Sequence, residues 1–232
     1  MFRSKLYKVQ TSKIDKQKQY ELNEALEILK SLPQVKFDQT VEIAFKLGID
    51  TKKSDQTIRG AVTLPKGTGK KVTVAVVAEG DAADSARSAG ADFVGGEDLI
   101  EKIKGGWFEF DSLIATPDAM PKLRALGKIL GPRGLMPNPK TGTVTENTAA
   151  AVKEAKAGRV EYRADKGGCA HVPVGKLSFN VNDLVENCDA VIQALISSRP
   201  SSSKGNFILT CSVCSTMSPG IKVKTNFSKT VA

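Results

Sequence analysis

Apolar residues near the start of the chain recur first with helical and then with strand spacing. Leucines at positions 22, 26 and 29 share one helical face with Ala25, and Pro33 ends this predicted helix. Positions 41–49 then alternate apolar with polar residues, which predicts a half-buried strand. Positions 57–65 repeat the alternation more weakly, and the glycine-rich, basic run at 65–71 is a candidate hinge.

The middle of the chain has a different pattern, in which continuous apolar runs alternate with helical segments. The run at 71–80 predicts a strand covered on both faces. A capped helix, with a Thr or Asn start and a glycine stop, is expected at 145–158. Alternating strands and helices indicate a small parallel α/β layer structure. The segments between these two are predicted as helix, strand, helix, strand and helix at 81–90, 91–96, 97–106, 111–120 and 121–130.

Beyond Gly158 the sequence again predicts mainly strands, with one long amphipathic helix at 181–198 between them. Neither flank alone has enough strands and helices for a good core. We therefore predict a protein of mixed α/β and α+β class with two domains. Residues 1–67 and 159–232 form one discontinuous domain, and 68–158 form a domain inserted into it. Strands are expected around the long helix at 159–165, 170–179, 205–214 and 220–227.

The net charge of +9 is segregated along the chain. Positions 68–158 hold 12 basic and 12 acidic residues, so the flanks hold 22 of the 34 basic and 13 of the 25 acidic ones. This distribution predicts that the two flanks bind a common polyanionic partner and that residues 68–158 have a different function. No signal peptide is evident, and the longest uncharged apolar run is too short to span a bilayer. We expect a cytoplasmic protein without membrane contact.

Enzymatic signals are weak. The single histidine, His171, has no acid at relay spacing, and the α/β middle lacks the G-x-G-x-x-G fingerprint of dinucleotide-binding folds. Cys211 and Cys214 lie three apart in a predicted strand, so they face opposite sides and do not converge on one ion. We predict no catalytic residue, cofactor or metal. A nucleotide-dependent enzyme using the central α/β domain is the alternative.

The loop "LGKILGPRGLMPNPKTGTV" at 126–144 combines glycines and prolines without any acid, histidine or cysteine. Its prolines remove the amide donors that an anion-binding loop needs. Glycines that permit positive φ and prolines that fix φ lock one irregular path, so we interpret the loop as architecture. Leu135 and Met136 are expected to anchor it to a core, and Lys128, Arg133 and Lys140 to leave its outside basic.

Four segments in order resemble the ribosomal protein L1 family, the mobile-stalk proteins of the large ribosomal subunit, in its bacterial or organellar form. They are "KLRALGKILGPRGLMPNPKTGTV" at 122–144, "KFDQTVEIAFKLGID" at 36–50, "VEYRADKGGCAHVPVGKLSF" at 160–179 and "STMSPGIKV" at 215–223. The resemblance implies that both termini build one basic split β-α-β domain and that the insert is a three-layer, Rossmann-like α/β domain.

The resemblance also implies a structural function. The first domain would bind large-subunit rRNA at the stalk, near the site where deacylated tRNA leaves. The protein would repress translation by binding a similar structure in its own-operon mRNA. It would be a monomer when free, and it would work in the cytoplasm, or in the stroma or matrix if it is organellar.

Carried over by position, the family's RNA-binding residues fall in three places. Shallow A-form minor grooves suit small hydroxyls and flat apolar contacts, and lysines suit phosphates. Phe37 and Met217 could instead be core residues, but Phe37 lies just outside the apolar alternation of 41–49 and is expected to be exposed. We expect the last turn to be held for recognition rather than packing. The residues are Lys36, Phe37 and Thr40, then Asp165, Lys166 and Gly168, then Ser215, Thr216, Met217 and Ser218.

One position departs from the family pattern. The family usually has Thr-Met-Gly-Pro in the last turn, and this chain has Ser218 in place of that glycine. A side chain therefore stands where the family's backbone approaches RNA closely, which puts the contact at this position in doubt.

Overall fold

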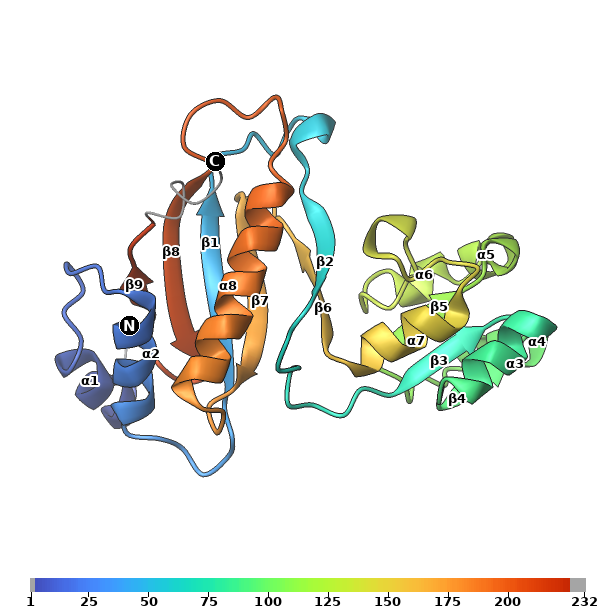
Figure 1. Ribbon diagram of the computed structural model, residues 1–232, viewed down its shortest axis with the longest axis horizontal. Helices are drawn as coiled ribbons and strands as arrows, with labels where there is room; N and C mark the ends of the chain where they lie inside the picture. The colour runs from blue at the N-terminus through green and yellow to red at the C-terminus, as the bar shows by residue number, and fades with distance from the viewer. Residues whose placement is uncertain (1–2, 226–232) are drawn as a thin grey trace. The chain divides into compact units, whose positions relative to one another are not determined.

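The computed structural model describes residues 3–225, apart from the side chain of Ser54, and shows a mixed α/β protein (Figure 1). The chain divides into two compact units. The first takes the residues up to Gly69 and those from Val160 onward, and the second takes Lys70–Arg159. The predicted mixed α/β class is confirmed. Residues 226–227 of the last expected strand lie outside the described residues.

The first unit is built on a four-stranded antiparallel sheet in the order β7-β1-β8-β9, with β1 between β7 and β8 (Figure 1). Thr40 at the start of β1 pairs with Lys176, and Val41 pairs with Ser215. Lys46 near the end of β1 pairs with Cys169. The strands are β1 (Thr40–Leu47), β7 (Cys169–Lys176), β8 (Ile208–Ser215) and β9 (Ile221–Val223).

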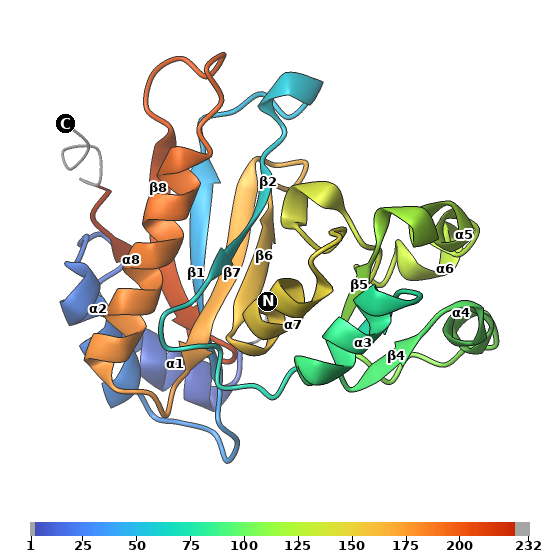
Figure 2. The same cartoon turned by 45° about the vertical axis from the view of Figure 1, so that its right-hand side comes forward.

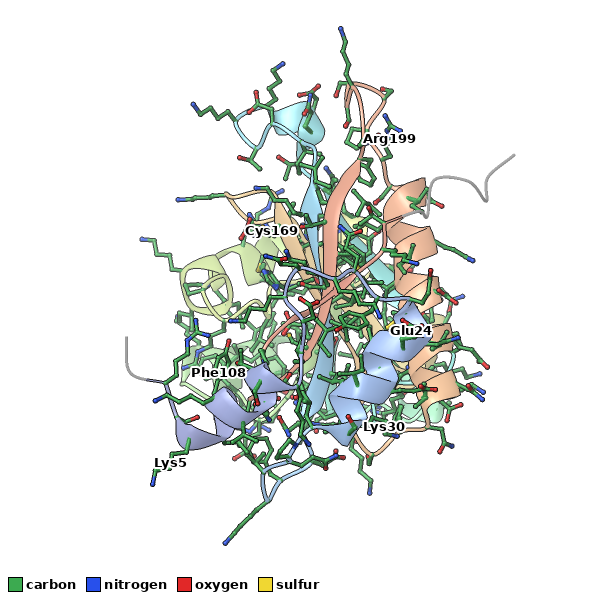
Figure 3. The ribbon with its side chains drawn as sticks, turned by 90° about the vertical axis from the view of Figure 1, so that its left-hand side faces the viewer. Lys5, Glu24, Lys30, Phe108, Cys169 and Arg199 are labelled. Atoms are coloured by element: carbon green, nitrogen blue, oxygen red, sulfur yellow. The ribbon has the colours of Figure 1, made fainter. Side chains whose placement is uncertain are left out.

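Two helices, α2 (Leu22–Ser31) and α8 (Val181–Ser197), pack against one face of this sheet. They lie side by side in Figure 3, where Glu24 and Lys30 mark α2. Alternate residues of β1 are buried in the same core as the leucines of α2. The amphipathic patterns that predicted these elements are therefore confirmed, and one face of the sheet is left for other contacts.

Helix α1 (Lys5–Ser12) was not predicted, because it buries almost nothing apolar. Its only fully buried residue is Gln10, whose Nε2 donates to Pro33 O at 2.8 Å, while Val9 is half-exposed. Ser4 caps the helix by accepting from Tyr7 N at 3.2 Å. A helix held by caps and polar contacts has no apolar stripe for periodicity to detect.

A second, two-stranded sheet joins β2 (Arg59–Thr63) to β6 (Arg159–Arg163). Most of β2 is only half-buried, which explains its weak alternation. A Cβ at Gly60 would come within 2.6 Å of the Tyr162 hydroxyl, so glycine leaves the space that this ring occupies.

The second unit is a three-layer structure around a parallel sheet of order β4-β3-β5 (Figure 2). All of the central strand β3 (Val74–Val77) is buried, as its continuous apolar run predicted. One face packs against α3 and α7, and the other packs against α4, α5 and α6. The other elements are β4 (Phe93–Gly95), β5 (Ser112–Ala115), α3 (Asp81–Ser88), α4 (Glu97–Lys104), α5 (Met120–Arg124), α6 (Gly127–Leu130) and α7 (Thr148–Lys156).

The glycine- and proline-rich loop follows a fixed irregular path. Leu135 and Met136 pack against the core of the second unit, as expected. Gly134 and Gly142 have φ values of 73° and 66°, which side chains rarely adopt. Asn138 N donates to the Thr143 hydroxyl at 2.8 Å, which ties the loop to itself. These contacts support the interpretation of the loop as architecture.

Candidate nucleic-acid interface

The predicted residues at the start of β1 and in the turn after β8 lie together at one end of the sheet. Thr216 N donates to Thr40 O at 3.1 Å, which joins the two segments. The side chains of Phe37 and Met217 are 53% and 50% exposed. The alternative that they are core residues is therefore wrong, and the prediction that they are exposed is confirmed.

A buried amide, Gln39, organises this end of the sheet. It is 1% exposed, and its Oε1 accepts hydrogen bonds from Ser215 Oγ at 2.9 Å and from Met217 N at 3.0 Å. One side chain thus holds the backbone from which Met217 projects. We did not predict this role, although a signal exists: Gln39 is in phase with the inward-facing Val41 and Ile43, so its amide had to be buried and bonded.

The small hydroxyl side chains of this cluster are mainly internal. Thr216 Oγ1 accepts from Thr40 N at 3.1 Å, and Thr40 Oγ1 accepts from Lys176 Nζ at 2.9 Å. Ser215 is only 5% exposed. The prediction that the turn is held for recognition rather than packing is therefore wrong for Ser215, because its hydroxyl donates a hydrogen bond to Gln39 Oε1.

Ser218 closes the turn in the place of the family's glycine. Its Oγ accepts from Ser215 N at 2.8 Å and lies 3.2 Å from Pro219 O. No residue other than glycine has a positive φ among the described residues, so Ser218 adopts its conformation without left-handed strain. The hydroxyl is directed into the turn, which leaves the outer side of the turn to Met217.

The second cluster is the turn between β6 and β7. Asp165 Oδ1 accepts from Cys169 N at 2.8 Å and closes this turn. That backbone hydrogen bond lowers the pKa of Asp165, with further lowering from the Gly167 amide and from the charges of His171 and Lys46. Gly168 has a φ of 72°, where glycine is favoured. Asp165 and Gly168 thus shape the turn from which other groups project.

Lys36 and Lys166 are the free cations of the two clusters. Both are exposed, and neither forms an ion pair within residues 3–225. An exposed ammonium without a carboxylate partner retains its full charge for an external anion. The structure therefore leaves at least one such cation at each end of the predicted interface.

The two clusters lie at opposite ends of β1. Leu47 N donates to Gly168 O at 2.8 Å, and Lys46 Nζ donates to Gly167 O, so the turn after β6 is fixed to the end of the strand. Seven residues of antiparallel strand separate the ends, which corresponds to about 24 Å at ~3.4 Å per residue. Cys169, labelled in Figure 3, marks the start of β7 beside this second cluster.

Between the clusters runs the face of the sheet that points away from α2 and α8. His171 Nδ1 lies 3.1 Å from Glu42 Oε1 on this face, and the His171 side chain is 58% exposed. Sequence reasoning did not assign these residues to the interface, although the outward phase of each strand identifies them. The partly or fully exposed residues of this face include Glu42, Ala44, Lys46, His171, Pro173, Ser212 and Cys214.

The cysteines are free thiols without a metal site in the described part of the chain. Cys211 is buried on the helix side of β8, and burial raises the pKa of its thiol to about 12. Cys214 is half-buried on the opposite face, where burial and the charge of Glu42 raise its pKa. The prediction that the two thiols face opposite sides is confirmed.

A model of the ribosomal protein L1p/L10e family matches residues 28–219, which is most of the chain. The match covers both clusters of the candidate interface up to Pro219 and the whole second unit. Within residues 3–225, no helix is long and apolar enough to cross a membrane.

Proposed function

The chain belongs to the ribosomal protein L1p/L10e family, and we propose that its first unit binds the rRNA of the mobile stalk, near the site where deacylated tRNA leaves. Proteins of this family are structural, non-enzymatic components of the large ribosomal subunit that bind rRNA. The proposal assigns RNA binding to residues 1–67 and 159–232 as one domain and leaves 68–158 as an inserted domain.

One observation carries the proposal. Exposed apolar side chains and an unpaired cation project from one end of β1, and a second unpaired cation projects from the other end. A-form RNA presents a wide, shallow minor groove of sugars, hydroxyls and base edges, bordered by phosphates. A sheet face about 24 Å long, with an exposed cation beyond each end, is complementary to that surface.

We assign two roles to the predicted residues, contact with RNA and positioning of the contacting side chains. Lys36 and Lys166 pair with phosphates, while Phe37 and Met217 pack on sugar or base faces. The remaining members hold these four in place. They are Gly168 and Asp165 in one turn, and Thr40, Ser215, Thr216 and Ser218 in the other.

The same surface accounts for the finer roles in the proposal. A repressor of its own-operon mRNA needs only an mRNA structure similar to the rRNA site, since the groups that contact RNA are the same. We propose this role for the bacterial form of the protein, acting as a monomer when free. Contact with deacylated tRNA would then follow from the position of the stalk.

Met217→Ala tests the proposal, with Ile129→Ala as the matched control. Met217 is half-exposed, so its loss removes about 1–1.4 kcal/mol of binding, or five- to tenfold in Kd. Ile129 is 38% exposed on α6 in the second unit, and its loss leaves RNA affinity unchanged. Filter binding to a stalk rRNA fragment measures both, beside thermal melts. Equal affinity for wild type and Met217→Ala would remove this turn from the RNA interface.

A further inference from the structure

One acidic side chain lies in the middle of the face that we propose for RNA. Glu42 is the only aspartate or glutamate in strands β1, β7, β8 and β9, all of which lie within residues 3–225. Its side chain points away from α2 and α8, because Val41 and Ile43 on either side of it are buried in the core with those helices. Glu42 is two residues along β1 from Thr40, which corresponds to about 7 Å. A carboxylate therefore lies between the two clusters, where bound RNA would cover it.

The charge of Glu42 opposes phosphates and favours hydrogen-bond donors. Its side chain is 39% exposed, and its neighbours across the sheet are Pro173 on β7 and Cys214 on β8. Proline has no hydrogen-bond donor, and a thiol is a weak one. RNA that covers this face must therefore bring a donor to the carboxylate, because a charge that loses water without gaining a hydrogen bond is costly.

His171 engages one oxygen of this carboxylate and leaves the other free. Its Nδ1 lies 3.1 Å from Glu42 Oε1, and it is the diagonal neighbour of Glu42 in the sheet, since it pairs with Ala44. No residue within 3–225 supplies a hydrogen bond or an ion pair to Glu42 Oε2. The imidazole thus restrains the direction of the carboxylate, and Oε2 remains available to an external donor.

The minor groove of A-form RNA offers two kinds of donor to a carboxylate. The groove is wide and shallow, and it displays 2′-hydroxyls and base edges. Of the base edges in a minor groove, only guanine presents a donor, its 2-amino group, while the others present acceptors. Sugars and phosphates border the groove, and the base edges lie along its centre. Glu42 has the matching position, because the residues that we assign to phosphates and sugars lie at the two ends of the face.

We propose that Glu42, positioned by His171, recognises one guanine of the bound RNA by accepting a hydrogen bond from its 2-amino group. Contacts with phosphates and sugars fix the register of a protein on RNA, but they carry no sequence information. The contact of Glu42 with a base edge supplies that information. This inference rests on the proposed RNA binding of the first unit and names a specificity-determining residue within it.

Inosine, which is guanosine without the 2-amino group, tests the contact directly. Guanosines in the paired part of the stalk rRNA fragment are replaced by inosine one at a time, and filter binding to the full chain gives the Kd for each RNA. We expect one replacement to weaken wild-type binding about tenfold, as for the loss of a hydrogen bond to a charged group. A 2′-deoxy substitution at the same nucleotide should change the Kd by less than about twofold, because the carboxylate does not use the ribose hydroxyl.

Three variants and a control connect the inosine penalty to the two side chains. Glu42→Ala should bind the guanosine and inosine RNAs equally, with the guanosine RNA weakened up to about tenfold relative to wild type. His171→Ala should reduce the preference for guanosine about two- to threefold, because the carboxylate is no longer positioned. His171→Asn, whose amide can donate in place of Nδ1, should retain the preference. Glu24→Ala is the control and should leave it unchanged, since Glu24 is an exposed carboxylate on α2, on the other side of the sheet (Figure 3).

The outcomes separate this inference from the proposed function. If the wild-type chain does not bind the unmodified fragment, the proposed function itself fails. If it binds, tighter binding of Glu42→Ala to every RNA would overturn the inference, because the carboxylate would then only repel phosphates. An inosine penalty that Glu42→Ala leaves in place, or a 2′-deoxy penalty that it removes, would also overturn the inference. A full preference for guanosine in His171→Ala would overturn the positioning role of His171.

Discussion

The substitution Gln39→Met is the sharpest test of how the turn that we propose to bind RNA is held. Methionine keeps the length of the side chain but removes the acceptor that serves Ser215 Oγ and Met217 N. The buried Ser215 hydroxyl then loses its partner, at about 1–3 kcal/mol, and the Met217 amide loses a bond worth about 1 kcal/mol. We expect the free energy of unfolding to fall by about 2–4 kcal/mol.

Gln39→Met should also weaken RNA binding, although the buried Gln39 side chain cannot itself touch RNA. Without the Gln39 acceptor the backbone of Met217 is no longer fixed, so the side chain loses its preset position and ordering it on binding costs entropy. Filter binding to the rRNA fragment and urea unfolding measure the two effects separately. A decrease of about 4–16 °C in Tm accompanies the expected loss of stability, at ~2–4 °C per kcal/mol for a chain of this size.

Gln10→Met is the matched control for Gln39→Met. Gln10 is also 1% exposed and donates one hydrogen bond, to Pro33 O at 2.8 Å, but it lies on α1 and holds no predicted RNA-binding residue. Because the buried Gln10 Oε1 has no partner, Gln10→Met also removes an unsatisfied acceptor, so it should change stability less than Gln39→Met does and leave RNA affinity unchanged. The double variant Gln39→Met, Ser215→Ala should recover part of the lost stability, since removing both partners of a buried hydrogen bond is less costly than removing one. Unchanged stability and affinity in Gln39→Met would refute the reasoning.

Three further predictions concern the same interface. Lys36→Ala and Lys166→Ala should each make the slope of log affinity against log salt shallower by roughly 0.7–0.9, and Lys153→Ala on α7 should leave it unchanged; an unaltered slope in the first two would exclude phosphate contacts. Because Asp165 has a lowered pKa, its contribution to stability is present above pH ~4 and is lost as the pH falls further, so Asp165→Asn should differ from wild type in thermal melts near neutral pH and converge with it in acid. Ser218→Gly should lower the free energy of unfolding by about 1–2 kcal/mol, through one lost hydrogen bond and added chain entropy, with RNA affinity retained; a large loss of affinity would show that the hydroxyl contacts RNA.

Elements with a clear apolar period were predictable from the sequence, and those held by polar contacts were not. The strand at Val74–Val77 and the helix at Val181–Ser197 both bury a continuous apolar set, so their patterns sufficed. Helix α1 buries only Gln10, and it is held by an N-cap and a long-range hydrogen bond. No local pattern encodes the distance between Gln10 and Pro33 in the fold.

In the candidate site, too, burial and exposure could be predicted from the sequence, and polar contacts could not. The exposure of Phe37 followed from its position outside the alternating strand, and that of Met217 from the expectation that the last turn is held for recognition. The burial of Ser215 was also readable, because it is in phase with Cys211 and Val213 on β8. The sequence did not predict which hydroxyl bonds to which partner, because the hydrogen bond between Thr216 and Thr40 depends on the register of β8 against β1.

The distribution of charges and ion pairs supports the proposal that the net charge of +9 serves a binding surface in the first unit rather than being a general property of the chain. In the second unit five of the 13 basic residues have carboxylate partners, all of them within that unit. In the described part of the first unit, only three of the 20 Lys and Arg side chains form an ion pair. Exposed ion pairs add little stability, so their distribution matters mainly for the field. The second unit has 13 basic and 12 acidic residues and is nearly neutral, whereas the described part of the first unit has 20 basic and 13 acidic residues, so we expect the first unit to release counterions from RNA. Affinity for rRNA should therefore depend on salt through the first unit alone.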